Sequence, residues 1–102
     1  MNTNALIAHS RARFDHAVAK RVLKEKYEAK MLFAYNGGMW RAGPELLTLL
    51  KSIPVENNVV FLDLYGTPVK INPLELQHLA FGRWQEQMNA WLIEYEKNSK
   101  KR

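Results

Sequence analysis

Cysteine is absent from the 102 residues of this chain, which excludes disulfides and every cysteine-ligated metal site. The absence also fits a reducing compartment. No apolar run approaches the roughly 18 residues that a transmembrane helix needs, and residues 1–14 have no apolar run before their charges. We therefore expect neither a membrane span nor a signal peptide. Apolar residues make up 47% and charged residues 25%, so we expect one folded domain over residues 1–102, frayed at residues 1–3 and 98–102.

The side-chain patterns of an enzyme are missing too. A nucleophile needs a neighbouring base and a group that orients the base, and there is no Gly-x-Ser-x-Gly motif here. His9 and His16 are seven residues apart, too far along a helix to share a metal ion without a third ligand between them. His78 stands alone, and we expect it to pack partly buried. Asp63 interrupts an apolar strand, and we expect it to bind the backbone of a turn or face solvent. The sequence predicts no enzymatic activity, cofactor or metal.

The longest helix signal lies in the last quarter of the chain. Asn72 can cap a helix, Pro73 suits the first helical position, and Glu75 stands three residues after the cap, as in a capping box. Large side chains then recur in steps of seven: Leu74, Phe81, Met88 and Tyr95 on one heptad position, and Gln77, Trp84 and Trp91 on another. We expect a helix over residues 73–97 whose apolar stripe is broad and needs a cover.

A second long helix is predicted at the start of the chain, over residues 4–29, where no glycine or proline interrupts it. Phe14, Val18 and Val22 recur in steps of four along one side. The other side carries a basic stripe of His9, Arg13, His16, Lys20 and Lys24. We interpret this stripe as a solvated face; the alternative is a track for phosphates or for an acidic partner.

The middle of the chain predicts short strands and one short helix. Asn36-Gly37 lies between two apolar runs, which is a strong hairpin signal, so we expect a hairpin over residues 31–42. The alternative is that the first helix continues and ends at Gly37. The further expected elements are a helix over residues 44–51, a strand over residues 59–64 and an edge strand over residues 68–71. The predicted fold is α+β, in the order α-β-β-α-β-β-α, with both hairpins in one small, mostly antiparallel sheet.

Charge is distributed unevenly over these elements. The net charge is +5, yet residues 1–30 carry a net +4 and residues 73–96 a net −3. A positive first helix and a negative last helix can attract each other within the fold or between chains. The basic residues at 97–102 suit a solvated helix end.

Three segments carry a resemblance: FAYNGGMWRAGPEL at 33–46, LDLYGTPV at 62–69 and WQEQMNAW at 84–91. With these, the chain resembles small proteins encoded by large contractile-tailed bacteriophages and cyanophages. The resemblance implies a phage context, in the bacterial host cytoplasm or the virion. It implies no catalytic or binding residue.

We expect a chain this small to lack the means to cover its whole aromatic helix, so part of the stripe should meet a protein. The predicted function is therefore that of a non-enzymatic phage structural or assembly protein that binds a protein partner or itself. The expected contact residues are Trp84, Met88, Trp91 and Tyr95. One alternative is a nucleic-acid-binding accessory factor that uses Arg13, His16, Lys20 and Lys24. Another is a phage inhibitor of a host protein.

Overall fold

A computed structural model describes the backbone of residues 3–54 and 57–99 and the side chains of residues 15–54 and 57–98. The elements are α1 (Thr3–Lys30), β1 (Leu32–Tyr35), β2 (Gly38–Arg41), α2 (Pro44–Lys51), β3 (Val59–Leu62), β4 (Pro68–Ile71) and α3 (Pro73–Ser99). This is the predicted α+β order, which is confirmed. The molecule is elongated, with extents of 68 × 25 × 21 Å.

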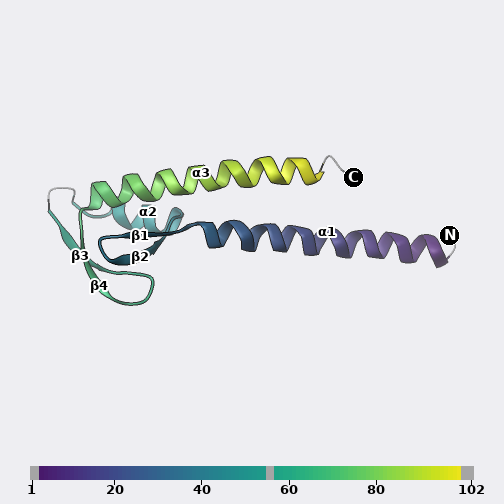
Figure 1. The fold of residues 1–102 in the computed structure, drawn as a ribbon, viewed down its shortest axis with the longest axis horizontal. Coiled ribbons are helices and arrows are strands. Elements are labelled where there is room, and N and C mark those ends of the chain that lie inside the picture. The colour runs from purple at the N-terminus through teal and green to yellow at the C-terminus, as the bar shows by residue number, and fades with distance from the viewer. Residues whose placement is uncertain (1–2, 55–56, 100–102) are drawn as a thin grey trace.

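The two long helices lie side by side in antiparallel directions (Figure 1). The strands and α2 gather at the end where α1 stops and α3 starts. The first part of α1 continues past the far end of α3, so it has no neighbouring element there. The molecule therefore has a broad end built from strands and helices, and a slender end built from helix alone.

A ring stack and an ion pair are among the contacts that hold α1 against α3. The ring of Tyr27 stacks on Trp91 with centroids 5.8 Å apart and an interplanar angle of 8°. Lys26 Nζ lies 2.8 Å from Glu94 Oε1. Of the predicted series along α1, Val22 is 53% exposed and Val18 is half-buried; the Phe14 side chain lies outside the described ones.

The start of α3 is fixed by the predicted cap. Asn72 Oδ1 accepts hydrogen bonds from the backbone N–H groups of Leu74 and Glu75, at 3.1 and 3.2 Å. The second half of a capping box, a bond from the Asn72 N–H to Glu75, is replaced. That N–H donates to the hydroxyl of Tyr35 at 3.3 Å, so the first turn of α3 is attached to β1.

Hairpin 1 joins β1 and β2, and hairpin 2 joins β3 and β4. In hairpin 1, Phe33 faces Trp40 across the strands, and the turn places Asn36 at φ 49° and Gly37 at φ 81°. The hairpin prediction is thus confirmed, and the alternative of a continued first helix is wrong. Hairpin 2 turns at Gly66, with φ 80°. Its first strand ends two residues earlier than predicted, because Asp63 already belongs to the turn.

The hairpins form two separate two-stranded sheets and not one continuous sheet. They are joined at Met39 and Asp63. Asp63 Oδ2 accepts the Met39 N–H at 3.0 Å, and the Leu64 N–H donates to the Met39 carbonyl at 2.8 Å. Oδ1 of the same aspartate accepts the N–H groups of Tyr65 and Thr67, at 3.0 and 2.8 Å. Asp63 therefore binds backbone, as the sequence predicts.

Close packing reinforces this junction. Gly38 lies so near hairpin 2 that an added Cβ would be 3.0 Å from Val69 Cγ2 and 3.1 Å from Asp63 Cβ. At the tip of hairpin 1, Asn36 Nδ2 donates to the Lys70 carbonyl at 3.1 Å. The two small sheets are thus held together by these contacts, although no ladder of strand hydrogen bonds joins them.

The core lies where both hairpins, α2 and the first half of α3 meet. Its most enclosed side chains include Leu50, Ile71, Leu76 and Ala80, each at most 1% exposed. Trp40 is 3% exposed, and its indole N–H donates to the Tyr35 carbonyl at 3.0 Å. One face of α3 is therefore fully used in folding the chain.

Candidate functional site

A second face of α3 carries apolar side chains that the described part of the chain leaves exposed. We call these residues the outer stripe; their exposed fractions are 56% for Leu74, 52% for Phe81, 36% for Met88, 54% for Leu92 and 44% for Tyr95. They recur in steps of seven, four and three, so they share one side of a helix with 3.6 residues per turn. From Leu74 to Tyr95 the stripe advances by 21 residue steps, which is roughly 32 Å at the 1.5 Å rise per residue.

Trp84 and Trp91, two of the four predicted contact residues, mainly hold the fold together. Trp84 is half-buried, packs against the core and meets the Phe81 ring edge-on at 6.3 Å and 71°. Trp91 is half-buried and stacks on Tyr27. The other two predicted residues, Met88 and Tyr95, belong to the outer stripe.

A groove of about 460 Å³ joins Trp84, Met88 and Trp91 to the broad end of the molecule. Its other wall comes from the end of α1, hairpin 1 and the start of α2. Glu28, Arg41 and Glu45 contribute charges of both signs to this wall. The outer stripe therefore borders a hollow whose lining is aromatic on one side and mixed on the other.

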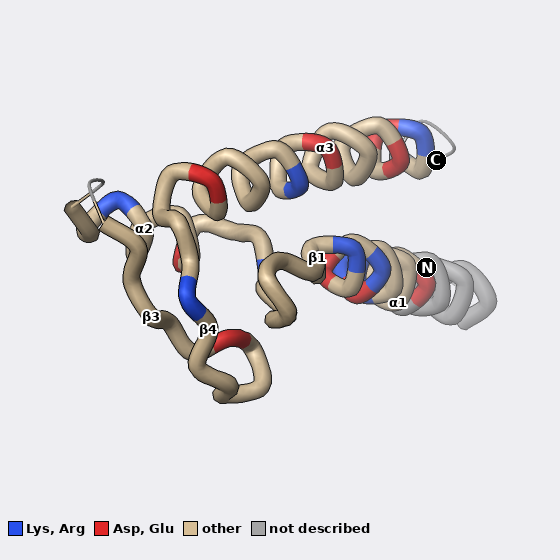
Figure 2. The backbone as a smooth tube through the Cα atoms, turned by 60° about the vertical axis from the view of Figure 1, so that its left-hand side comes forward, with Lys and Arg blue, Asp and Glu red and all other residues tan. Residues whose placement is uncertain are grey.

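The charged residues of α3 avoid the outer stripe. Figure 2 shows the acidic positions spread along α3. Glu94 is bound by Lys26 through both carboxylate oxygens, at 2.8 and 3.1 Å. Residues 74, 78, 81, 85, 88, 92 and 95, which follow the stripe along the helix, include no Asp, Glu, Lys or Arg. A charge-free apolar face is typical of the centre of a protein interface.

Three pKa values are shifted at the contact between the two long helices. The hydrogen bond to Glu94 raises the pKa of Lys26, and the same bond lowers the pKa of Glu94. Burial raises the pKa of the neighbouring Tyr27 hydroxyl. These shifts stabilise the charged pair and the neutral phenol, so they belong to the contact between α1 and α3 and indicate no proton transfer.

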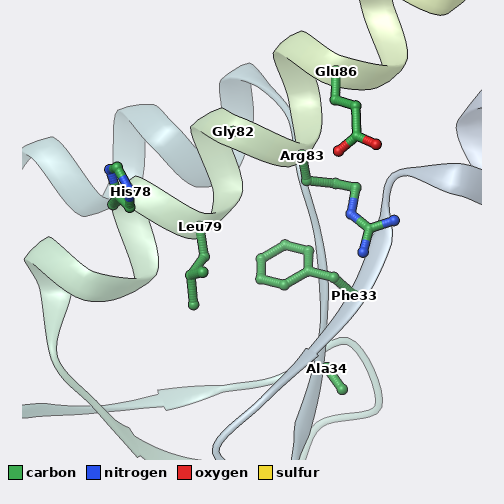
Figure 3. A pocket seen from close by; sticks show the side chains of 7 residues that line it. All are labelled: Phe33, Ala34, His78, Leu79, Gly82, Arg83 and Glu86. Atoms are coloured by element: carbon green, nitrogen blue, oxygen red, sulfur yellow. The ribbon is translucent and has the colours of Figure 1, made fainter.

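A second hollow, of about 370 Å³, lies on the other flank of α3. Figure 3 shows Arg83 and Glu86 projecting from α3 beside Phe33 of β1. His78 also lines this hollow; it is exposed, which corrects the prediction of a partly buried packing residue. The lining brings no nucleophile and base together. Across the described residues, no three His, Asp or Glu side chains are grouped so that they could hold a metal ion.

The basic residues predicted for the nucleic-acid alternative are only partly described. Lys20 is exposed and His16 half-buried. The Lys24 side chain is 63% exposed, with its Nζ 3.8 Å from Glu28 Oε1. The side chain of Arg13 lies outside the described ones, as does that of His9. The structure therefore places Lys20 and Lys24 at the surface of α1, and Lys24 forms an ion pair with Glu28.

Sequence reasoning identified the helix and its aromatic content, and two of its four contact candidates, Met88 and Tyr95, are exposed. Leu74 and Phe81 belong to the exposed side, and the two tryptophans belong to the fold. The available signal was Leu92, which extends the series of Leu74, Phe81 and Met88 at helical spacing. Two neighbouring apolar stripes on one helix leave open which of them faces inward.

No helix in the described part of the chain is both long and apolar enough to cross a lipid bilayer. Comparison of the chain with models of protein families, with curated proteins and with solved structures finds no match.

Proposed function

We propose that this protein is a non-enzymatic structural or assembly protein that acts through protein–protein contacts made by the outer stripe of α3. The resemblance to small proteins of contractile-tailed phages implies a phage context for this role. The observation that carries the proposal is the exposure of five large apolar side chains along one charge-free face.

The stripe is large enough to matter energetically. Complete burial of a large apolar side chain stabilises by about 1.5–3 kcal/mol, so covering a half-exposed one contributes about 1 kcal/mol. Exposed apolar patches that are continuous and bordered by polar residues mark interaction sites. Scattered exposed apolar residues need no explanation, but five in one line on one helix do.

A nucleic-acid role has less support. The outer stripe lies on a helix whose charge is negative, and negative charge repels phosphates. On α3, Phe81 and Trp84 meet edge-on, and Trp91 stacks on Tyr27. Base-stacking sites instead present aromatic faces between basic residues.

The test compares two adjacent exposed residues of α3. Leu92 belongs to the stripe, and Ile93, which is 64% exposed, lies about 100° further around the helix. A tagged wild-type protein, Leu92→Glu and Ile93→Glu are purified from cells that make the protein natively, and the co-purifying proteins are quantified by mass spectrometry. We expect Leu92→Glu to lose partners, including untagged copies of the chain, that wild type and Ile93→Glu retain.

Both variants should fold, because both side chains already face solvent, and circular dichroism checks this. An identical partner set for the two variants would contradict the proposal. It would show that the stripe is not the contact surface.

A further inference from the structure

We infer that the outer stripe of α3 is covered by the outer stripe of a second copy of this chain, with the two α3 helices antiparallel. This inference rests on the proposed function and specifies the partner and the geometry of the same surface.

The spacing of the stripe identifies the occupant as a helix. Exposed or half-exposed positions continue along α3 in alternating steps of four and three: Leu74, His78, Phe81, Gln85, Met88, Leu92 and Tyr95. A repeat that averages 3.5 residues keeps one side of a helix facing a partner helix along its whole length. A strand or a loop would not match this repeat.

A second copy fits the chemistry of this face. In a two-fold contact the same patch of both copies forms the interface. A charged residue near the centre of the patch would therefore lie close to the same charge on the other copy and repel it. The stripe contains none. His78 and Gln85 lie between members of the stripe along the same side of α3, and polar residues in such a seam select the register of the two helices.

The area is sufficient for a specific dimer. An aromatic side chain offers roughly 150–250 Å² when fully open and leucine or methionine somewhat less, so each half-exposed member of the stripe offers on the order of 100 Å² or a little under. Five such side chains from each copy would cover roughly 1,000 Å², which reaches the lower range of specific interfaces. We therefore expect a reversible dimer that depends on protein concentration.

The shape of the molecule requires the antiparallel orientation. The hairpins and α2 make one end broad, beside the start of α3, while the end of α3 is slender (Figure 1). A parallel pair would bring both broad ends to the same place. An antiparallel pair places each broad end beside the slender end of its partner, and it also opposes the two helix dipoles favourably.

The first experiment measures mass against concentration. Sedimentation equilibrium of the purified chain should give a monomer–dimer equilibrium for wild type. We expect Leu92→Glu to raise the dimer dissociation constant about tenfold or more, because each dimer then buries two charges against apolar side chains. Ile93→Glu should leave it within about twofold, because surface changes away from a contact have small effects. A chain that stays monomeric up to millimolar concentration, or equal effects of the two variants, would overturn the inference.

The second experiment determines the orientation. Because the chain has no cysteine, single cysteines can be placed at will and joined with a short bis-maleimide. Gln85→Cys, at the middle of the stripe, should cross-link to itself. Leu74→Cys should cross-link to Tyr95→Cys when the two variants are mixed, but not to itself. Self-linking of Leu74→Cys, or no linking at any of these positions, would overturn the antiparallel arrangement.

The two proposals can fail separately. If the purified chain is monomeric but Leu92→Glu still loses a different protein from native cells, self-pairing is wrong and the contact function stands. If Leu92→Glu changes neither the mass nor the partners, both are wrong.

Discussion

The packing of Gly38 against hairpin 2 allows a quantitative prediction. An alanine Cβ at this position would lie 3.0 Å from Val69 Cγ2 and 3.1 Å from Asp63 Cβ, closer than carbon atoms pack at their optimum of about 3.5–4.0 Å. Neither neighbour can retreat easily, because Val69 is only 8% exposed and Asp63 is fixed by three backbone hydrogen bonds. Overpacking of this kind costs about 1–3 kcal/mol.

Part of that cost is offset, because replacing a strand glycine by alanine otherwise gains about 0.5–1 kcal/mol. We expect Gly38→Ala to lower the free energy of unfolding by about 1–2 kcal/mol. Urea unfolding followed by tryptophan fluorescence measures this, since the buried Trp40 lies in the same hairpin. A matched control is Gly82→Ala, where no atom lies within 4 Å of the added Cβ. This control should gain up to about 1 kcal/mol by helix propensity.

A double-mutant cycle tests whether Val69 is the obstacle. As a single change, Val69→Ala should lower the free energy of unfolding. In the Gly38→Ala background it should lower it by less, and the difference, the coupling energy, should be about 0.5–3 kcal/mol. If Gly38→Ala is as stable as wild type, or if the two changes are additive, the account of how the hairpins pack together is refuted.

Three further predictions concern single contacts. Asn72→Ala should lower the free energy of unfolding by about 1 kcal/mol through loss of the α3 cap, and Asn72→Ser should largely retain it; thermal melts by circular dichroism measure both. Hydrogen bonds from backbone N–H groups, first that of Met39, lower the pKa of Asp63. Its carboxylate therefore stabilises the fold above the unfolded pKa of about 3.9, and this contribution is lost as the pH falls through the lower folded value. Asp63→Asn should be less stable than wild type at pH 7, with a gap that narrows in urea titrations as the pH falls below about 3.9; a gap independent of pH would contradict this. Trp91→Leu should lose about 0.5–1.5 kcal/mol of stacking on Tyr27 and raise amide exchange in residues 23–30; unchanged exchange there would show that the stack does not hold α1.

Local signals in the sequence were enough to place the elements. Asn36-Gly37 specifies a turn that needs positive φ, and Pro44 and Pro73 each begin a helix at the residue the sequence indicates. These signals act over a few residues, and the tertiary structure does not override them here. The prediction that the chain alternates two hairpins with three helices could therefore be made without a structure.

The junction between the hairpins could not be predicted in this way. Asp63 binds Met39, which lies 24 residues earlier. No local sequence pattern in either segment indicates that the two residues are in contact. For a related reason, only part of the candidate site could be predicted from the sequence. Heptad spacing identifies two apolar stripes on α3, but the choice of Leu76 and Ala80 for the core depends on where α2 and the hairpins pack.

The Asp63 junction has a consequence for how this protein loses its structure. A two-stranded hairpin alone is marginal in water. Here the two hairpins support each other through the hydrogen bonds of the Asp63 carboxylate, of Leu64 with Met39 and of Asn36 with Lys70, and through the close packing of Gly38. We therefore expect neither hairpin to remain folded when the other unfolds. The broad end should thus open and close as one cooperative unit, so that damage in residues 59–71 is detected in residues 32–41 by hydrogen exchange.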